Sequence, residues 1–339
     1  IKLEKKLPSR NKVVKKLPTF IDCAAQCIES KKLEWRNVKH ASQWGNTLAT
    51  YAYPIIGNMP ISEIKRSHVL KILEPIWSTK TETATRVRGR IETVINWAKA
   101  RDLFVGDNPA CWEGGLKSIL PNPSKVQKVV NHLSMPYQDI PALMKTLYRL
   151  NYPSANALKM TIFTACRTSE VLNIQLKEIK DNVWTIPAER MKAGVEHKVP
   201  LPTQLMAIIK NSKNLGDASD SYLFTNLKKH SSLSSAAMTY LLKQLNLADV
   251  ATVHGFRSSF RMWSAEQTNY PREVCEQALA HKLPDKVEAA YMRSDFLEKR
   301  KQLMQDWADF ITSQLTQEEI DFHSNAVKEG KYLDQKSIT

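Results

Sequence analysis

Apolar residues recur at helical spacing through most of the first hundred residues. Four segments between Thr19 and Ala100 carry apolar positions three and four residues apart, which is the spacing of one face of an α-helix. The last segment, from about Thr81 to Ala100, is the longest. The expected inward positions are Phe20, Ala24, Cys27 and Ile28, then Trp44, Leu48 and Tyr51, then Leu70 and Leu73, and finally Val87, Ile91, Val94, Ile95 and Ala98. This pattern predicts a small helical bundle over residues 18–111.

The pattern changes after this bundle. Residues 112–135 hold Pro, Gly and Ser, as in LPNPSKVQK, and predict an interdomain linker. A second domain is expected over residues 136–315, with helices at about 138–150 and 153–166 and another within 295–313. The apolar stripe of that last helix is Phe296, Leu303, Trp307 and Phe310. At 339 residues the chain is long enough for both domains.

The stretch NVWTIPAERMKAGVEHKVPL carries the clearest strand pattern of the sequence. One run covers Val183–Ile186, a second covers His197–Leu201, and a Lys-Ala-Gly turn lies between them. Two such runs around a short turn predict a β-hairpin. The expected fold class is therefore mainly α with a small β-hairpin or sheet.

The charge of the chain indicates an anionic partner. The formal net charge is +15 and the pI is about 9.5. This favours nucleic acid over a membrane surface, because no basic amphipathic membrane helix stands out. A basic surface without a partner is the alternative. Residues 1–17 form a basic linker or arm with one acid, Glu4, and residues 316–339 form a polar tail. The basic residues of the arm are Lys2, Lys5, Lys6, Arg10, Lys12, Lys15 and Lys16.

Several classes of protein are disfavoured by what the sequence lacks. No apolar run approaches the roughly 20 residues that span a membrane, and the basic N-terminus has no apolar core of a signal peptide after it. The five cysteines are scattered, with no C-x-x-C, so we expect buried thiols in a reducing cytosol and neither disulfides nor a zinc site. No carboxylate cluster suggests a metal site, and we expect no cofactor.

Two motifs place charged residues beside apolar ones. In FTACRTSEVLNI, Arg167 begins a helix on an apolar platform, where a guanidinium is costly unless it is paired or binds an anion. Glu170, three residues later, offers a simple ion pair, and both interpretations stay open. In HGFRSSFRMW, His254 and Arg257 share one helical face, although a histidine in such a place is commonly a structural group.

Two further residues are unremarkable when each is considered alone. Lys192 lies in the predicted hairpin turn, where lysines are usually solvated. Tyr291 lies on the apolar face of a predicted helix together with Val287 and Ala290, and Asp285 is placed to cap that helix. Spacing alone therefore makes Tyr291 a core aromatic residue.

The order of these pieces resembles the tyrosine recombinase (phage integrase) family. The pieces are TACRTSEVL, RMKAGVEHKVPL, HGFRSSF, LAHK and AAYMR. The phrases LAHK…VEAAYMR, MQDWADF and TETATRVRGRIETVINWA…DNPA are similar to the integrases of satellite phages and genomic islands. The resemblance covers about residues 19–312. It matches six positions together: Arg167, Lys192, His254, Arg257, His281 and Tyr291.

The chain departs from the family pattern in two respects. Ala165 stands where the family more often has Gly. The N-terminal arm-binding domain that many such integrases carry is not found ahead of the helical bundle, so either the chain is truncated or the basic leader is what remains of that domain.

The resemblance implies both a fold and an activity. A helical core-binding domain and a mixed α/β catalytic domain would form a clamp around DNA. The activity would be site-specific recombination, in which DNA is cleaved and rejoined through a 3′-phosphotyrosyl intermediate to integrate or excise a mobile element. Tyr291 would be the nucleophile. Arg167 and Arg257 would neutralise the phosphate oxygens, and His254 would add a further donor.

The remaining two residues suit proton transfer. A phenol has a pKa of about 10, so Tyr291 needs a base or a positive field, which His281 or His254 would provide. Lys192 would protonate the departing 5′ oxygen as general acid. The phosphotyrosyl bond conserves the energy of the phosphodiester, so that neither ATP nor a metal is required.

The partners are also inferred from the resemblance. Double-stranded DNA attachment sites are expected, with Arg86 and Arg90 on the long helix as candidate contacts, although a solvated helix face is the alternative. The family works as a homotetramer on two DNA sites, with C-terminal segments docked between neighbours and accessory DNA-bending or directionality proteins in some cases. The expected location is the bacterial cytoplasm, with association to the nucleoid when the protein is bound.

Two other functions stay open at this point. A type IB topoisomerase has a similar Arg/Lys/Arg/His/Tyr set, but the His of HGFR and the spacing from His281 to Tyr291 favour a recombinase. A catalytically silent DNA-binding regulator could have lost any of the six residues, and all six are present.

Overall fold

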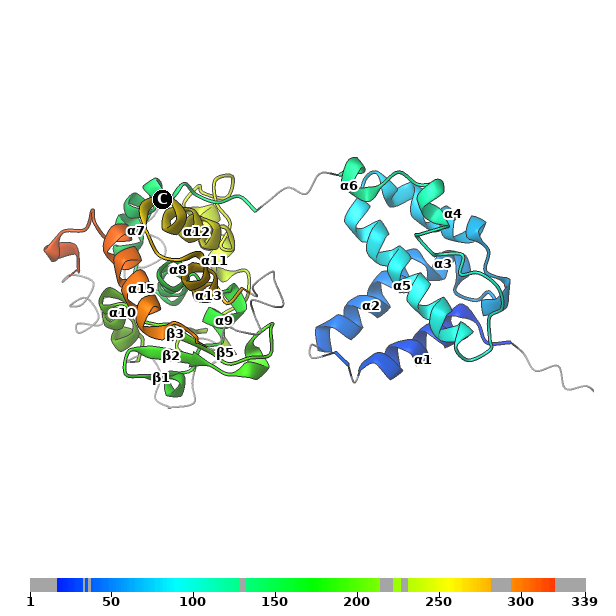
Figure 1. Ribbon diagram of the computed structural model, residues 1–339, viewed down its shortest axis with the longest axis horizontal. Helices are drawn as coiled ribbons and strands as arrows, with labels where there is room; N and C mark the ends of the chain where they lie inside the picture. The colour runs from blue at the N-terminus through cyan, green and yellow to red at the C-terminus, as the bar shows by residue number, and fades with distance from the viewer. Residues whose placement is uncertain are drawn as a thin grey trace, which may run out of the picture. The chain divides into compact units, whose positions relative to one another are not determined.

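The computed structural model describes residues 17–32, 34–35, 38–127, 132–213, 222–226, 231–281 and 294–320. The chain divides into two compact units, residues 1–130 and 131–339 (Figure 1). Each unit has a hydrophobic core of its own. Within the described ranges, no helix combines the length and the apolarity that crossing a membrane needs.

The first unit is a helical bundle, as the sequence predicts. The long helix α5 contacts α1, α2, α4 and α6, because apolar residues on successive turns give it a continuous buried face. Its inward residues Val87, Ile91, Val94 and Ala98 are fully buried. The helices are α1 (Phe20–Lys32), α2 (Val38–Tyr51), α3 (Tyr53–Ile56), α4 (Arg66–Trp77), α5 (Thr81–Lys99) and α6 (Pro123–Val126), with 3₁₀ turns η1 (Ile61–Glu63) and η2 (Leu116–Ser118).

Residues 112–127 pack onto the first unit, whereas the sequence suggests a linker there. The Trp112 ring stacks on Trp77 with centroids 5.7 Å apart, and the Trp77 indole Nε1 donates to the Pro121 carbonyl at 2.9 Å. Leu116 and Leu120 are buried in the same core. The prolines and glycines of this stretch shape turns, and its apolar residues fix the turns to the bundle. The exact domain boundaries stay predictions.

The second unit is mainly helical with a small antiparallel sheet. Its helices are α7 (Ile140–Tyr148), α8 (Pro153–Thr164), α9 (Thr168–Leu172), α10 (Thr203–Lys213), α11 (Ala237–Gln244), α12 (Gly255–Gln267), α13 (Arg272–Ala278) and α15 (Leu297–Ile311). The 3₁₀ turns are η3 (Tyr137–Asp139), η4 (Leu176–Glu178) and η5 (Ala188–Arg190). The strands are β1 (Ile179–Lys180), β2 (Val183–Ile186), β3 (His197–Pro200), β4 (Thr225–Asn226) and β5 (Ser231–Ser232).

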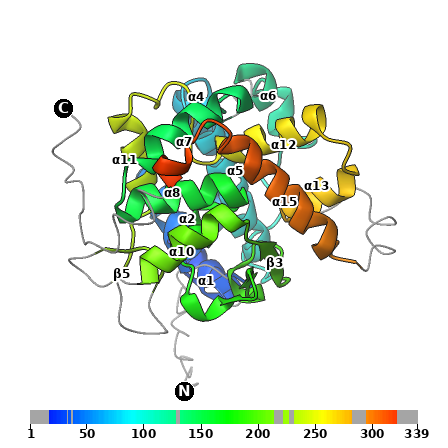
Figure 2. The ribbon, with the colours of Figure 1, turned by 90° about the vertical axis from the view of Figure 1, so that its left-hand side faces the viewer.

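Helix α8 lies at the centre of this unit. It contacts α7, α9, α10, α11, α12 and α15, and ten of its twelve residues are buried, so it is buried on every side rather than along one stripe. Helix α15 runs beside α13 and β3 (Figure 2). The fully buried Trp307 of α15 donates its indole Nε1 to the Ile162 carbonyl of α8 at 2.9 Å. This core fixes the ends of α8, α12 and α13.

The predicted hairpin is confirmed. Strands β2 and β3 pair antiparallel, with Trp184 opposite Val199 and Ile186 opposite His197. A third strand, β1, pairs with β2 and completes the sheet in the order β1-β2-β3. The sequence analysis missed β1 because a strand of two residues has no alternation to detect. The connection from β2 to β3 carries Lys192.

The segment 132–135 is docked onto the start of α12. The Leu133 carbonyl accepts hydrogen bonds from the backbone N and the Oγ1 of Thr252, at 2.9 and 3.1 Å. The Ser259 hydroxyl donates to the Met135 carbonyl at 2.5 Å. Gly255 is required at this point, because a Cβ added there would lie 2.0 Å from the Leu133 oxygen. Backbone oxygen cannot yield as a flexible side chain can.

Replacement of Gly255 by Ala should therefore destabilise the second unit, by about 1–3 kcal/mol, the usual cost of forcing atoms into a packed site. Gly89 in α5 provides the matched control, since an added Cβ there meets nothing within 4 Å. Gly89→Ala should stabilise the first unit, by up to about 1 kcal/mol, through helix propensity. Denaturant unfolding measures both changes. If both variants changed the free energy of unfolding by the same amount in the same direction, the close contact between Gly255 and the Leu133 oxygen would be unimportant for stability.

Candidate active site

Arg167 lies at a corner between two helices. Helix α8 ends at Ala165, which has a left-handed backbone with φ of 50°, and Arg167 is the N-cap residue of α9. The Arg167 guanidinium donates to Glu170 Oε1 at 2.8 Å, and its backbone N donates to Glu170 Oε2 at 2.8 Å. The ion pair considered in the sequence analysis is thus present. The Arg167 side chain nevertheless stays 23% exposed, so it remains accessible to an anion.

The left-handed backbone at Ala165 accounts for the Gly that the family more often has at this position. Glycine adopts this conformation without a steric cost, whereas alanine does so at a cost of about 1 kcal/mol. Alanine can therefore occupy the position where the family more often has Gly, and the corner that presents Arg167 is kept.

Arg257 is buried in the first turn of α12, with 5% of its surface exposed. Its guanidinium donates to the Ala165 carbonyl, to the Leu279 carbonyl at 2.7 Å and to His281 Nε2 at 3.1 Å. Burial first and then the nearby Arg167 lower the pKa of Arg257, yet an arginine remains charged at neutral pH. One permanent cation thus ties the α8–α9 corner to the residues that follow α13.

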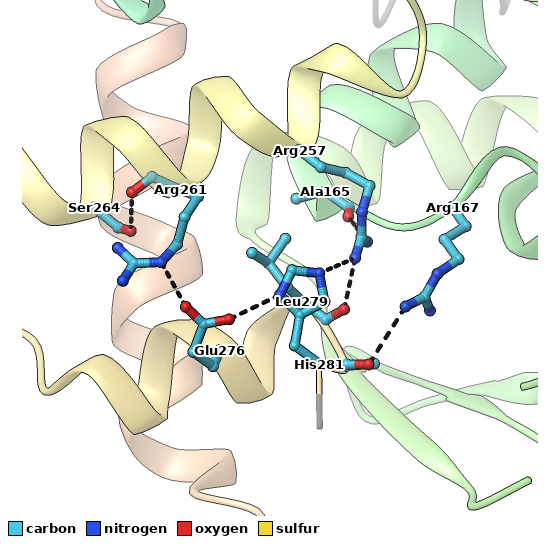
Figure 3. A network of polar contacts seen from close by, with 9 residues as sticks. Ala165, Arg167, Arg257, Arg261, Ser264, Glu276, Leu279 and His281 are labelled. Carbon is cyan, nitrogen blue, oxygen red and sulfur yellow. Dashed lines mark hydrogen bonds and ion pairs between the residues drawn. The ribbon is translucent and has the colours of Figure 1, made fainter. Parts of the chain in front are cut away.

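His281 is held on both sides of its ring (Figure 3). Its Nδ1 lies 2.7 Å from Glu276 Oε2, and Glu276 Oε1 accepts from Arg261 Nε at 2.9 Å. Since Nε2 faces an N–H of Arg257 and Nδ1 faces a carboxylate, we assign a neutral ring protonated at Nδ1. Burial alone would raise the pKa of the Glu276 carboxyl, but the hydrogen bonds from Arg261 and His281 together lower it, so the carboxylate is ionised.

His254 is the N-cap residue of α12, and its ring is exposed. The ring of His132, from the docked segment 132–135, meets it edge to face with centroids 5.0 Å apart. Desolvation first, then Arg257 and His132, lower the pKa of His254. The imidazole is therefore neutral at pH 7 and available to exchange a proton.

Two hollows share His281 as a common wall. The first has a volume of about 520 Å³ and is lined by Arg167, Lys192, Ala193, Arg272, Glu276, Ala280 and His281. The second has about 510 Å³ and is lined by His254, Arg257, Ser258, Arg261, Met262, Ala265, Leu279 and His281. The structure therefore brings together five of the six residues singled out in the sequence. Tyr291, together with its predicted helix and the Asp285 cap, lies outside the described residues.

The two candidate DNA-contact residues of the first unit differ in environment. Arg86 is 64% exposed and pairs with Glu82 on the same helix. Arg90 is only 8% exposed; it donates to the Gln43 carbonyl at 2.8 Å and lies over the Trp44 ring at 5.5 Å. Arg90 thus joins α5 to α2, and Arg86 is the more accessible of the two.

Sequence analysis did not identify Glu276 or His132. Glu276 lies five residues before His281, and this spacing has no special meaning within a helix. Only the turn after α13 folds His281 back onto Glu276, where the His281 backbone N also bonds the Glu276 carbonyl. His132 lies in a segment whose docking depends on contacts more than a hundred residues away in sequence. No local pattern could have revealed either residue.

His197 illustrates a buried histidine without a role in the site. It lies on β3, is hydrogen-bonded to the backbone of Ala278, and burial first and then Arg300 lower its pKa to about 4. The ring is therefore neutral and structural. Among the described residues, no group of three or more His, Cys, Asp or Glu side chains is placed to hold a metal ion.

Comparisons with known proteins assign both units. Residues 20–115 match the phage integrase central domain, and residues 134–298 match the phage integrase family. The chain is 30% identical over 289 residues to prophage integrase IntA of Escherichia coli (strain K12), covering 82% of this chain and 68% of that protein. It is 27% identical over 332 residues to the integrase of Enterobacteria phage P4, covering 88% and 72%.

A solved structure shows the same fold. The lambda integrase tetramer bound to a Holliday junction superposes with a TM-score of 0.61 at 14% identity, over 83% of this chain and 79% of that one. Such a low identity establishes the architecture and leaves the roles of individual residues to the geometry described above.

The geometry around His281 makes a prediction about its tautomer. In the wild type the ring should carry its proton on Nδ1, because Glu276 accepts it. Glu276→Ala removes this acceptor, so the Nε2-protonated form should gain population. Nitrogen-15 spectra of the histidine rings report the tautomer directly. His68 is the control, because its Nδ1 accepts from the Lys65 backbone N and its proton should stay on Nε2 in both proteins. A wild-type His281 ring that carries its proton on Nε2 would contradict the assignment.

Proposed function

The chain belongs to the phage integrase family, whose members are tyrosine recombinases that cleave and rejoin DNA, and we propose that the two hollows around His281 form its active centre. The observation that carries this proposal is the convergence of Arg167, Lys192, His254, Arg257 and His281 from separate elements. The substrate is a phosphodiester of double-stranded DNA at an attachment site. The product is an integrated or excised mobile element.

The two arginines supply the charge for the phosphate. Of the five N–H groups of a guanidinium, Arg257 uses three in the hydrogen bonds described above, so two remain. Arg167 retains further donors beyond its contact to Glu170. Fixed donors of this kind stabilise the negative charge that builds on the non-bridging oxygens, and they need no reorganisation during the reaction.

Proton transfers complete the proposed step. The Tyr291 hydroxyl loses its proton to the neutral imidazole of His254, since Nε2 and Nδ1 of His281 already face Arg257 and Glu276, and the phenolate oxygen bonds to phosphorus. The bond from phosphorus to the 5′ oxygen breaks, and the Lys192 ammonium gives that oxygen a proton. A 3′-phosphotyrosyl link and a free 5′-hydroxyl result. Attack by a new 5′-hydroxyl reverses the step without ATP.

The assembly is also proposed by analogy. Lambda integrase forms a tetramer on a Holliday junction, and a homotetramer on two DNA sites is the corresponding state for this chain, with accessory DNA-bending or directionality proteins as further partners. Residues 316–339 are the candidate contact between subunits. Of these, the described residue Glu319 pairs with Lys145 of α7 and with Arg149, the residue that follows α7. The expected site of action is the bacterial cytoplasm, at the nucleoid.

The nucleophile can be tested with a duplex nicked beside the cleavage position, taken from the DNA that flanks the gene. Wild type should form a covalent 3′ adduct that traps the protein on the DNA, and Tyr291→Phe should form none while it still binds. Tyr240 is the matched control, because it is exposed on α11 of the same unit, and Tyr240→Phe should keep the adduct. Denaturing gels detect it. An adduct in Tyr291→Phe would exclude this nucleophile.

Measurements of supercoil relaxation and strand exchange, together with the adduct, separate the alternatives. A type IB topoisomerase would relax supercoils without exchanging strands between two sites. A DNA-binding regulator would bind the duplex and give no adduct in the wild type. Strand exchange between two labelled duplexes, dependent on Tyr291, is the outcome expected of a recombinase.

The role of Lys192 can be tested by changing the leaving atom. Lys192→Ala should slow cleavage by about 100-fold or more, the usual contribution of a general acid. Sulfur in place of the bridging 5′ oxygen should largely remove this loss, because a thiolate leaves without protonation. Arg167→Gln is the control, since its defect concerns charge on non-bridging oxygens and sulfur should not rescue it. Single-turnover adduct formation measures both. If Lys192→Ala slowed cleavage equally on the oxygen-bridged and the sulfur-bridged DNA, Lys192 would not be the general acid.

A further inference from the structure

Arg272 shares a hollow with the catalytic residues although no motif marks it. It is the first residue of α13 and is exposed. Its side chain lines the hollow of about 520 Å³ together with Arg167, Lys192 and His281. A third arginine thus faces the space that the proposed reaction assigns to the phosphodiester.

The other arginines that the structure describes in the second unit are engaged with protein groups. Arg149, Arg167, Arg190, Arg261 and Arg300 each have an acidic partner, and Arg257 donates to two carbonyl oxygens and to His281. Within the described part of the chain, Arg272 alone among the arginines of this unit has neither an ion pair nor a hydrogen bond from its side chain. Its guanidinium is therefore available to a ligand.

The nearest candidate partner of Arg272 is already occupied. Glu276 lies four residues later on the same helix, which is the favoured spacing for an ion pair. Its two carboxylate oxygens instead accept from Arg261 and His281. The arrangement that orients His281 thus leaves Arg272 without a carboxylate, on the wall of a hollow that contains two further cations.

We propose that Arg272 binds a backbone phosphate of the DNA next to the cleaved one. We place this phosphate on the side of the leaving 5′ oxygen, because Arg272 shares a hollow with Lys192, which the proposed reaction makes the proton donor to that oxygen. His254 lines the other hollow. A planar fork suits bidentate binding of phosphate oxygens. This inference rests on the proposed function, since it assumes that the hollow receives DNA.

The test compares the equilibrium binding of Arg272→Gln, Arg272→Lys and wild type to an intact duplex from the DNA that flanks the gene, because the nicked duplex would trap the wild type covalently. Arg272→Gln should weaken binding by about tenfold, the lower end for a charge-assisted hydrogen bond. It should also reduce the slope of log affinity against log salt by about 1, as expected for one lost phosphate contact. Arg272→Lys should restore the slope and only part of the affinity, because the ammonium is charged but lacks the fork.

Arg149→Gln provides the matched control. It removes the same charge from a side chain just after α7 that is 67% exposed and lines neither hollow, so the salt slope should match that of wild type. A slope for Arg272→Gln equal to that of Arg149→Gln would overturn the inference, provided that wild type forms the tyrosyl adduct. Absence of the adduct in wild type would instead refute the proposed function.

Discussion

A guanidinium placed inside a protein needs hydrogen-bond acceptors for most of its N–H groups, and Arg257 finds three acceptors in segments that are distant in sequence. Its donors reach the carbonyl of Ala165, the carbonyl of Leu279 and the ring of His281. Charged groups are costly to bury, so these contacts hold only when the α8–α9 corner and the end of α13 stand at fixed positions. The core formed by α8, α12 and α15 provides those positions. Folding of the second unit and assembly of its site are therefore one process, because the same side chain serves both.

The site carries more positive charge than its own acids neutralise. Glu170 and Glu276 compensate part of it, yet Arg167, Lys192 and Arg272 still face one hollow. Like charges at close range repel each other, which lowers the pKa of His254 and of Arg257 after the effect of burial. An anion in the hollow relieves this repulsion. Under the proposed function, a DNA phosphate in this hollow would meet the excess positive charge, and the same arginines would serve both binding and stabilisation of the transition state.

Much of the fold follows from local patterns, and most of the site does not. Helix α5 lies within a residue of its predicted bounds because its apolar period is long and regular. The β2–β3 hairpin was predicted for the same kind of reason. The packing of residues 112–127 was missed because Trp112 contacts Trp77 through the fold rather than through sequence spacing. The burial of Arg90 depends in the same way on Gln43 and Trp44 of another helix. For the catalytic set, sequence provided the residue types, and the distances between Arg257, His281 and Glu276 required the structure.

The docked segment 132–135 has a mechanical consequence. The chain that leaves the first unit enters the second through this segment, whose carbonyls are fastened to Thr252 and Ser259 on either side of His254 and Arg257. A tension applied along the chain therefore reaches α12 first, and it does so at the turn that holds both residues. The close contact between Gly255 and the Leu133 oxygen leaves little room for the segment to shift relative to α12. The described segment 132–135 is thus attached to the second unit beside the candidate catalytic residues His254 and Arg257, so a pull on this segment would act on α12 before it acts on the rest of the unit.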